Sequence, residues 1–421
     1  ISQVLHRQVY IEKIDVSIFS IVSGIEIKKV AISNFKTPQQ LAALQGKPVP
    51  ANDLFTGMES LLFKIRFLPL LRKQFDLKEL VLYSPVINLA KNKQGVLNCD
   101  DLIKSKKQSA EEEVKQPAKP ITADDLPVAV TVGEIGIKNG TINYYDGQND
   151  QRFQVYKLTT LAYDINIAPK ELEKKDDIKL KLALGLKTVG AMKTGSVQSF
   201  DIALDATGKV IPFDVKTRHL DPEVILHIAV PDGEITGLQI FNSVASIPLL
   251  GDYLGQYISF LKGKQQWKDS KETGVDVRYK DNKADLTNGR LDLKEAKLLF
   301  DGAVNTDSKA LDMNMDMVMK KDINEGVKSA LAKKIEAAIK SPEAKKYADS
   351  NKLADAAIEP MLNKDGQIDL KLKVGGTTKK TNTALVKPQL DSLGTVVKKA
   401  AGGVATQAGK QLLQDMLFKK K

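Results

Sequence analysis

The side chains that could carry catalysis or hold a metal are few in this chain, and they lie far apart. The three histidines are His6, His219 and His227, and the single cysteine is Cys99. Zinc sites take three or four such ligands at short characteristic spacings, and these residues show none of those spacings. His227 falls within an alternating apolar segment, opposite in phase to its neighbours, so we expect it to face solvent.

Oxygen donors gather in one loop, which contains Asp146, Asn149 and Asp150. Their order lacks the ligand spacing of an EF-hand, so the loop is interpreted as a polar turn. The chain also lacks a phosphate-binding glycine loop, a nucleophile elbow and a dinucleotide fingerprint. We therefore predict no catalytic residue, no metal site and no cofactor, and expect that the protein is not an enzyme.

The composition points toward lipid surfaces rather than nucleic acid. Of 421 residues, 42% are hydrophobic but only 6% are aromatic, and 63 basic residues against 52 acidic ones give a net charge of +11. The basic residues are mostly lysines spread along the chain, whereas nucleic-acid binding favours arginines and aromatics on one element. A dispersed basic surface suits anionic lipid headgroups instead.

No apolar run approaches the roughly 18 to 20 residues that a membrane-spanning helix requires. The sequence starts at Ile1 rather than at a methionine. We therefore expect a preceding segment, either a signal or a membrane anchor.

The clearest pattern in the chain is a period-two stripe at 311–319, L-D-M-N-M-D-M-V-M. Side chains alternate faces along a strand, so the stripe predicts a β-strand with one apolar face. Methionine adapts to irregular apolar surroundings, which suits either a protein core or the lining of a ligand surface. Both interpretations stay open for this strand taken alone.

Similar stripes recur through the chain. Their apolar residues, which we predict to line a shared groove, are Ile135, Ile137, Leu180, Leu182, Leu184, Leu186, Phe200, Ile202, Leu204, Leu226, Ile228, Val275, Val277, Leu291, Leu293, Leu311, Met313, Met315, Met317, Met319, Ile368, Leu370 and Leu372. Two packed sheets would use aromatics to fill the space between them, and aromatics are scarce here. We therefore predict a mainly β fold with helices (α+β), in which one long curved antiparallel sheet forms an open hydrophobic groove. A groove of this kind needs an apolar occupant, and lipid acyl chains are the natural one.

The predicted organisation has four parts. An N-terminal α+β unit at 1–104 is followed by a charged, proline-containing linker at 105–126, which has too few apolar residues to order itself. The groove domain at 127–380 contains helical insertions near 235–262 and 322–362, and an amphipathic tail at 381–421 ends the chain. Within these parts, Ser23-Gly24 and Asn139-Gly140 are predicted to form turns between strands.

The order of short motifs in the first hundred residues resembles the AsmA-like family of bacterial envelope proteins. The residues that carry the resemblance are Ser33, Asn34, Pro69, Leu70, Leu71, Pro85, Asn92, Gly95, Asn98, Asp101 and Leu102. The segment at 135–146, I-G-I-K-N-G-T-I-N-Y-Y-D, is also similar to that family, as is the closing Gly375-Gly376-Thr377. The family places a proline nearer to this ending than Pro388 lies here.

The resemblance implies a protein anchored in the bacterial inner membrane, with a β-groove in the periplasm that moves phospholipid toward the outer membrane. The function we expect is a periplasmic lipid-binding or lipid-transfer protein that holds phospholipid acyl chains. The alternative is an envelope assembly or scaffolding factor that binds protein partners. This chain is short for a bridge across the envelope, so a protein partner or an oligomer is also expected. The amphipathic tail is a further candidate for membrane contact.

Overall fold

The computed structural model describes residues 2–18, 22–72, 74–102, 121–125, 129–168, 170, 177–189, 199–339, 349–378, 380–392, 394–395 and 398. Strands dominate these residues and helices form a smaller part, so the predicted mainly β fold with helices is confirmed. Among the described residues, no helix is both long and apolar enough to cross a bilayer. The chain divides into two compact units, unit 1 at 1–235 and 268–281, and unit 2 at 236–267 and 282–421.

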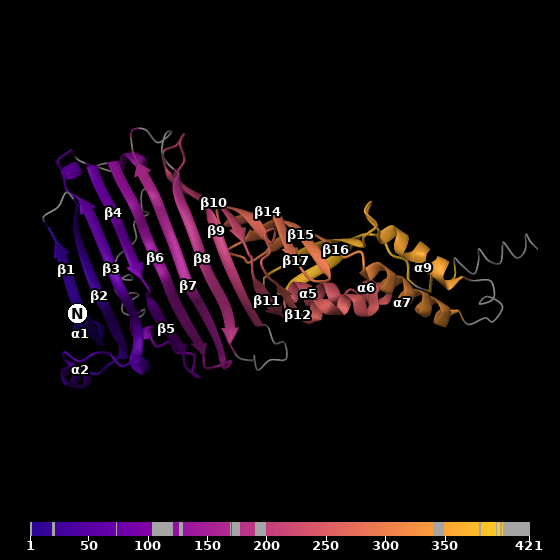
Figure 1. Cartoon of the computed structure of the whole chain (residues 1–421), viewed down its shortest axis with the longest axis horizontal. Helices are drawn as coiled ribbons and strands as arrows, with labels where there is room; N and C mark the ends of the chain where they lie inside the picture. The colour runs from indigo at the N-terminus through magenta and orange to yellow at the C-terminus, as the bar shows by residue number, and fades with distance from the viewer. Residues whose placement is uncertain are drawn as a thin grey trace, which may run out of the picture. The chain divides into compact units, whose positions relative to one another are not determined.

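Unit 1 is built on a long sheet whose strands follow one another in chain order (Figure 1). Its strands are β1 (Arg7–Ser17), β2 (Val22–Phe35), β3 (Leu54–Arg66), β4 (Gln74–Tyr83), β5 (Val86–Lys91), β6 (Ala129–Asp146), β7 (Gln151–Ile167), β8 (Ile178–Val189), β9 (Ser199–Phe213), β10 (Leu220–Ala229) and β13 (Gly274–Lys280), with β11 (Gly233–Thr236) reaching the boundary of the unit. Its short helices are α1 (Ser2–Leu5), α2 (Pro38–Leu44), η1 (Ala51–Asp53), η2 (Leu68–Arg72) and η3 (Ala123–Asp125).

The strand β6 joins the predicted N-terminal unit to the later strands of the sheet. Neighbouring strands from β1 to β10 pair antiparallel, except that β4 and β5 both pair parallel with the 18-residue β6. Strands β4 and β5, which precede the domain boundary predicted at residue 104, are therefore hydrogen-bonded to β6, which follows it. The structure divides the chain at 235–236 instead.

The linker predicted at 105–126 lies mostly outside the described residues. At its end, however, Ala123 is fully buried beside Phe213, and Thr122 bridges to His219. Arg218 binds Asp124 with its Nη2 atom 2.6 Å from the carboxylate oxygen. This end of the segment is therefore fixed on unit 1.

Unit 2 contains a shorter run of antiparallel strands and a group of helices. Its strands are β12 (Lys264–Trp267), β14 (Lys283–Asp292), β15 (Ala296–Asn305), β16 (Leu311–Met319), β17 (Asp369–Gly376) and β18 (Thr381–Lys387). Its helices are α5 (Gln239–Ala245), α6 (Pro248–Leu254), η4 (Gly255–Lys262), α7 (Ile323–Ala338), α9 (Ser350–Ile358) and η5 (Glu359–Met361), which lie within the two predicted helical insertions. Pro248 begins α6, so it separates two helices where the sequence suggested a kink.

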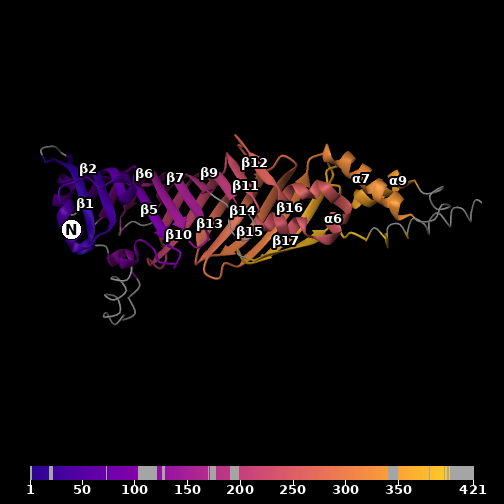
Figure 2. The same cartoon turned by 90° about the horizontal axis from the view of Figure 1, so that it is seen from below.

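The methionine stripe of β16 lies in the core of unit 2. Met317 pairs with Leu298 on β15 and with Leu370 on β17, and none of these three side chains is more than 2% exposed. The helices of unit 2 lie beside and beyond these strands (Figure 2), and they contribute buried residues of their own, including Leu250, Leu254, Ile258, Leu331 and Ile335. The opposite face of β16 carries Asp312 and Asn314, which are exposed. The open lining expected for this strand is therefore wrong, and the alternative of a protein core is what the structure shows.

The helical layer approaches closely enough to restrict residue size. A Cβ atom built on Gly326 of α7 would collide with the hydroxyl of Tyr257 on η4. A larger residue at position 326 would therefore require the Tyr257 side chain to move.

The tail predicted at 381–421 begins with a strand. Residues 381–387 form β18, which pairs with β17 and continues the row of Met315 and Leu372 through Leu385. Most of the amphipathic part of this tail lies outside the described residues.

We predict that Met317→Ala will lower the free energy of unfolding by about 2 to 5 kcal/mol, because it leaves a cavity in a closed core. Leu182→Ala on the half-buried face of unit 1 should cost clearly less, since solvent already reaches that side chain. Urea unfolding followed by circular dichroism measures both. Equal small losses would mean that the helices do not seal the methionine face.

Candidate functional site

One face of the unit 1 sheet carries apolar side chains from the first strand to the last. Residues directly opposite each other on paired strands point to the same face, so the strand register identifies each row of neighbours. The first row, defined here as row A, runs through Ile14, Ile27, Leu61, Leu82, Ile137, Thr160, Leu182, Ala206, Ile228 and Val275. Nine of its ten members are apolar, and each comes from a different strand.

A second row lies next to the first. Row B runs through Val16, Ile25, Phe63, Leu80, Ile135, Ala162, Leu180, Gly208, Leu226 and Val277. Row C lies on the other side of row A and runs through Val9, Ile32, Thr56, Ile87, Ile142, Val155, Leu186 and Ile202. Ten strands at the usual spacing of about 4.8 Å give rows A and B a length of about 43 Å.

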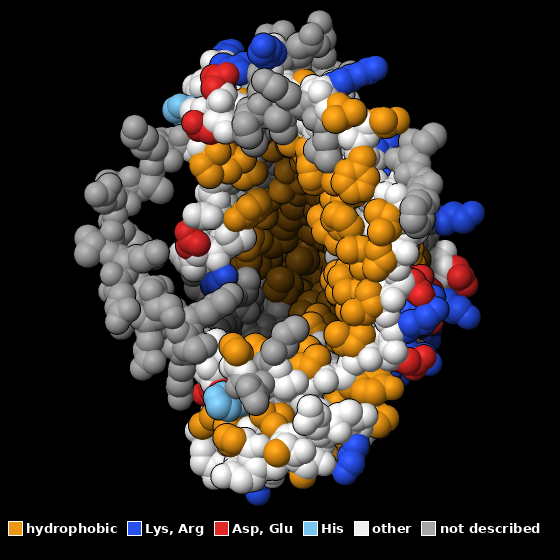
Figure 3. All heavy atoms as spheres, turned by 90° about the vertical axis from the view of Figure 1, so that its left-hand side faces the viewer, with side chains coloured by type: hydrophobic (Ala, Val, Ile, Leu, Met, Phe, Trp, Pro, Cys, Tyr) orange, Lys and Arg blue, Asp and Glu red, His pale blue; other side chains and the backbone are white. Residues whose placement is uncertain are grey.

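Within the described part of the chain, the apolar face is open. Viewed from the end at which β1 lies, hydrophobic side chains line a hollow, while lysines and carboxylates lie on the outside (Figure 3). Along β6, β8, β9, β10 and β13 nearly all the row residues are half-buried rather than buried. At β1 the exposure is greater, with Ile14 54% and Val16 59% exposed. These half-buried side chains keep part of their apolar surface available for contact with another molecule.

The other face of the same strands carries charge. Lys28 binds Asp15, Lys64 binds Glu79 and Lys179 binds Asp164, each pair joining two strands at 2.7 to 3.2 Å. His227 lies on this face with its Nδ1 atom 2.7 Å from Asp276, and its side chain is 65% exposed. The expectation that His227 faces solvent is therefore confirmed.

A tyrosine on the outer face has a displaced pKa. The Tyr156 hydroxyl donates to a carboxylate oxygen of Asp201 at 2.6 Å. This hydrogen bond favours the neutral phenol and raises the pKa of Tyr156 to about 12. The Tyr156 hydroxyl therefore stays protonated at neutral pH.

A crease crosses the sheet between rows A and C. Lys29, Ser84 and Asn139 each adopt a positive φ, of 47°, 48° and 57°. The residues just before them, Lys28, Tyr83 and Lys138, lie in one cross-strand row. In that row Ser60 of β3 pairs with both Lys28 and Tyr83, and Tyr83 pairs with Lys138. Lys157 on β7 also has a positive φ, of 52°, where the register of β7 shifts against β6. Left-handed residues of this kind bend a strand and increase its twist, so their alignment folds the sheet along one line.

The crease also shifts the apolar pattern by one residue. On β6, odd positions Ile135 and Ile137 face the groove before Asn139, and even positions Ile142 and Tyr144 face it afterwards. The hairpin predicted at Asn139-Gly140 is therefore wrong, because β6 continues through it. The turn predicted at Ser23-Gly24 is also wrong, since both residues lie within β2.

A niche of about 240 Å³ opens where the crease meets the groove. Its lining combines residues from both sides of the crease, namely Val30, Ile32, Thr56, Gly57, Met58, Leu82, Pro85, Ile87, Ile137, Gly140, Thr141, Ile142 and Leu158. Nearly all are apolar. Gly140 keeps the niche open, because a Cβ atom there would lie 3.1 Å from Ile137 and 3.2 Å from Pro85.

Beyond the niche an aromatic group continues the apolar face. The rings of Tyr144 and Phe153 lie 6.0 Å apart, and those of Phe153 and Phe200 lie 6.5 Å apart. Offset rings at these distances attract one another weakly and present large apolar surfaces.

We predict that Asn139→Val will lower the free energy of unfolding by about 1 to 2 kcal/mol, because a branched side chain disfavours the left-handed conformation. Asn139→Gly should be close to neutral, since glycine adopts positive φ freely. Thermal unfolding of the two variants measures the difference. Equal stability of both variants would contradict a left-handed residue at this position.

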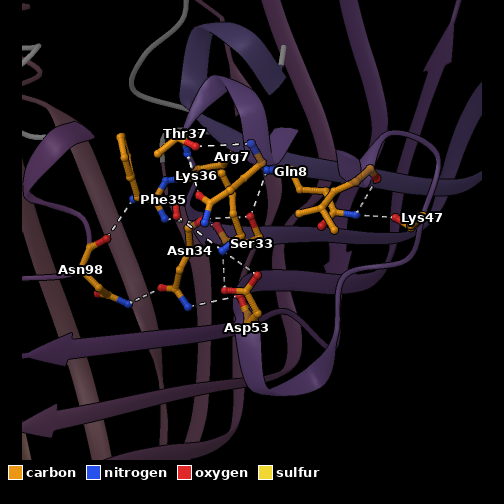
Figure 4. Close-up of polar contacts among 12 residues, drawn as sticks. Arg7, Gln8, Ser33, Asn34, Phe35, Lys36, Thr37, Lys47, Asp53 and Asn98 are labelled. Carbon is orange, nitrogen blue, oxygen red and sulfur yellow. Dashed lines mark hydrogen bonds and ion pairs between the residues drawn. The ribbon is translucent and has the colours of Figure 1, made fainter. Parts of the chain in front are cut away.

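A buried arginine fixes the first strand of the groove. Arg7 at the start of β1 is fully buried, and its guanidinium lies 4.3 Å from the centre of the Phe55 ring. It donates to the carbonyls of Ser33 and Asn98 at 3.2 and 2.9 Å, and to the Asp101 carboxylate at 2.8 Å. Figure 4 shows part of this group, with Arg7, Ser33 and Asn98 labelled.

The surrounding amides extend the same group. Asn98 Nδ2 donates to Asn34 Oδ1 at 2.9 Å, and Asn34 Nδ2 donates to the carbonyl of Asp53 (Figure 4). Three residues that carried the family resemblance, Ser33, Asn98 and Asp101, therefore accept hydrogen bonds from Arg7, and a fourth, Asn34, accepts one from Asn98. Their role in the structure is to hold the start of the groove rather than to line it.

We predict that Arg7→Met will lower the free energy of unfolding by about 3 to 5 kcal/mol, because it leaves a carboxylate and two carbonyls without their donor. The matched control is Arg66→Met, whose side chain is 46% exposed and binds Asp76 at 3.1 Å. An exposed pair of this kind contributes about 1 kcal/mol or less. Chemical unfolding of both variants gives the comparison, and an equally small loss at Arg7 would contradict its structural role.

The structure brings one part of the predicted lining together and separates the rest. Thirteen of the predicted residues, from Ile135 to Val277, lie in unit 1. The register places ten of them in rows A to C, and the other three, Leu184, Phe200 and Leu204, lie beside these rows on β8 and β9. The ten predicted residues from Leu291 to Leu372 lie in unit 2, where most of them are in the closed core and so do not line an open face: Leu293, Met313, Met315, Met317, Met319, Ile368, Leu370 and Leu372. Leu291 and Leu311 are half-buried in that unit.

Sequence reasoning missed the contribution of the first hundred residues. Ile14, Ile27, Leu61 and Leu82 begin row A, although the predicted groove started at residue 127. Their own alternation was a usable signal, since Ile25 and Ile27 or Leu80 and Leu82 repeat the pattern of later strands. The niche residues gave no such signal, because the crease breaks the alternation there.

Among the described residues, no group of three or more His, Cys, Asp and Glu side chains is placed to hold a metal ion. The open apolar face is thus the main candidate site of the described chain. Its chemistry is that of a surface that shields apolar groups from water.

Comparison with known families identifies the family of the chain. The chain belongs to the AsmA family, whose family model matches residues 1–414. Membership indicates an association with the bacterial envelope, and the family is not known as a family of enzymes. No curated protein and no solved structure matched the chain.

Proposed function

We propose that unit 1 binds the acyl chains of phospholipids along rows A to C and transfers them through the periplasm between the inner and outer membranes. The protein would do this while held at the inner membrane. The observation that carries the proposal is the alignment of apolar side chains across ten strands on an open face.

The energetics support a lipid occupant. Each shielded methylene contributes about 0.8 kcal/mol, so covering ten methylenes contributes about 8 kcal/mol. The rows extend about 43 Å, which is nearly three times the hydrocarbon thickness of one leaflet at about 15 Å. Acyl chains therefore have room to lie along the rows.

The lining also supports movement along the groove. Rows A and B contain aliphatic side chains and no charged residue. A uniform aliphatic surface shields a chain equally well at successive positions, so no single position holds it strongly. Headgroups would stay in water at the open side.

The test is native mass spectrometry on protein purified without detergent. We expect co-purifying phospholipid in the wild-type protein and its loss in Leu182→Asp, which places a charge in the middle of row A. The control is Thr207→Asp, which adds the same charge to the exposed outer face between Lys181 and His227. Circular dichroism checks that both variants fold.

A wild-type protein without lipid, or equal lipid in the two variants, would contradict the proposal. A second variant probes the niche without adding charge, since Gly140→Val fills it with a larger side chain. We expect this variant to retain less lipid than the wild type.

One observation favours the alternative of an assembly factor that binds protein partners. The strand β1 lies at the margin of the unit 1 sheet (Figure 1), and its apolar residues are among the most exposed in the unit. Strand edges of this kind accept strands from other proteins. Under this alternative the purified protein carries no lipid and Leu182→Asp leaves partner binding unchanged.

A further inference from the structure

The most exposed apolar side chains of unit 1 include a group at one corner of its sheet. The apolar corner consists of Val16 and Ile18 at the end of β1, and of Phe67, Leu68 and Leu71 after β3. Leu71 is 85% exposed, Ile18 64% and Leu68 60%. These values far exceed those of the half-buried residues along the rows.

Strand register places the two halves of this corner side by side. Val22, the first residue of β2, pairs with Arg66, the last residue of β3. Ile18 lies just before the start of β2, and Phe67 follows Arg66 directly. The ends of β1, β2 and β3 meet at the same end of the sheet (Figure 1).

The conformation of the second half presents its leucines outward. The backbone turns through the 3₁₀-helix η2, L-P-L-L-R at 68–72, before β4 begins. Pro69 prevents both a long helix and a continuing strand there. The Pro-Leu-Leu motif, which has no part in the Arg7 group or in the rows, therefore lies in a turn that exposes Leu68 and Leu71.

The basic residues near the apolar corner favour an anionic partner. The segment 64–73, K-I-R-F-L-P-L-L-R-K, contains four basic residues and no acidic one. Arg72 is exposed, and Arg66 is 46% exposed beside Asp76. Apolar side chains bracketed by basic ones suit the boundary of an anionic bilayer, where leucines enter the acyl region and arginines meet phosphates.

We propose that the apolar corner is a membrane-surface contact that inserts Leu68 and Leu71 into a bilayer containing anionic phospholipid. This contact is separate from any anchor and from the C-terminal tail, and it does not depend on the proposed lipid cargo. Val16 is also the first member of row B, so a bilayer bound at the corner lies against the first strand of the groove.

The first experiment is flotation of the full chain with vesicles of phosphatidylcholine, with or without phosphatidylglycerol. We expect the wild type to float with the anionic vesicles and Leu68→Asp/Leu71→Asp to lose at least about tenfold in partitioning, because two leucines no longer enter the membrane. The matched control is Val4→Asp/Val96→Asp, which adds the same charge at positions 83% and 43% exposed, away from the corner. We expect the control to bind like the wild type.

A depth measurement separates insertion from an indirect effect on folding. In a Cys99→Ser background, Leu71→Cys or Val4→Cys carries the only thiol, to which an environment-sensitive fluorophore is attached. Phospholipids brominated on their acyl chains should quench the label at position 71 at least several-fold more than the label at position 4.

Three results would overturn the proposal. They are no flotation of the wild type, equal flotation of the wild type and the leucine double variant, or equal quenching at the two labelled positions. Equal flotation would place membrane binding elsewhere in the chain, and no flotation would leave a protein as the occupant of the corner. Native mass spectrometry of Leu68→Asp/Leu71→Asp separates this proposal from the proposed function. Lipid retained by a variant that no longer floats would show that membrane binding at the corner and lipid binding in the groove are lost independently.

Discussion

Cross-strand register is the constraint on which unit 1 depends. A strand has only two faces, so a slip of one residue between neighbours would turn half of the apolar side chains toward water. Ten strands hold Ile14 of the first and Val275 of the last in one row because every pairing between them keeps its phase. The buried Arg7 group fixes the first of these strands, and charged pairs on the outer face mark the side that stays wet.

The two units have the same alternating strand pattern, but its apolar face is buried in unit 2 and open to solvent in unit 1. In unit 2 helices accompany the strands, and Met317 of the sheet is fully buried, as are the helix residues Leu331 and Leu250. In unit 1 the corresponding residues Leu182 and Ile137 are only half-buried. What distinguishes a core from a binding surface here is therefore how far the apolar face is covered, not the strand itself.

This distinction explains how far the sequence could predict the site. Alternation in K-L-K-L-A-L-G-L identified Leu180 and Leu182 correctly as one face of a strand, because period two is a local property. The same reasoning placed Met315 and Leu372 in the groove, since alternation carries no information about what lies above the strand. The crease could not be predicted for a related reason, since Asn139-Gly140 has the composition of a hairpin turn. That β6 continues is evident only from its partners, because it pairs with β4 before this point and with β5 after it, and Asn139 bonds to Ser84 between those two strands.

The crease also bears on how such a chain can change in length. Removing the extra residue at position 139 alone would make the alternation of β6 regular and keep Ile142 and Tyr144 on the groove side, but it would straighten this strand while its neighbours keep their bend. Because the neighbours meet the same line at Lys29, Ser84 and Lys157, insertions and deletions in these strands are tolerated only as matched changes on several of them. Sequence drift in this sheet should therefore favour substitutions along the rows and confine length variation to the loops at the strand ends.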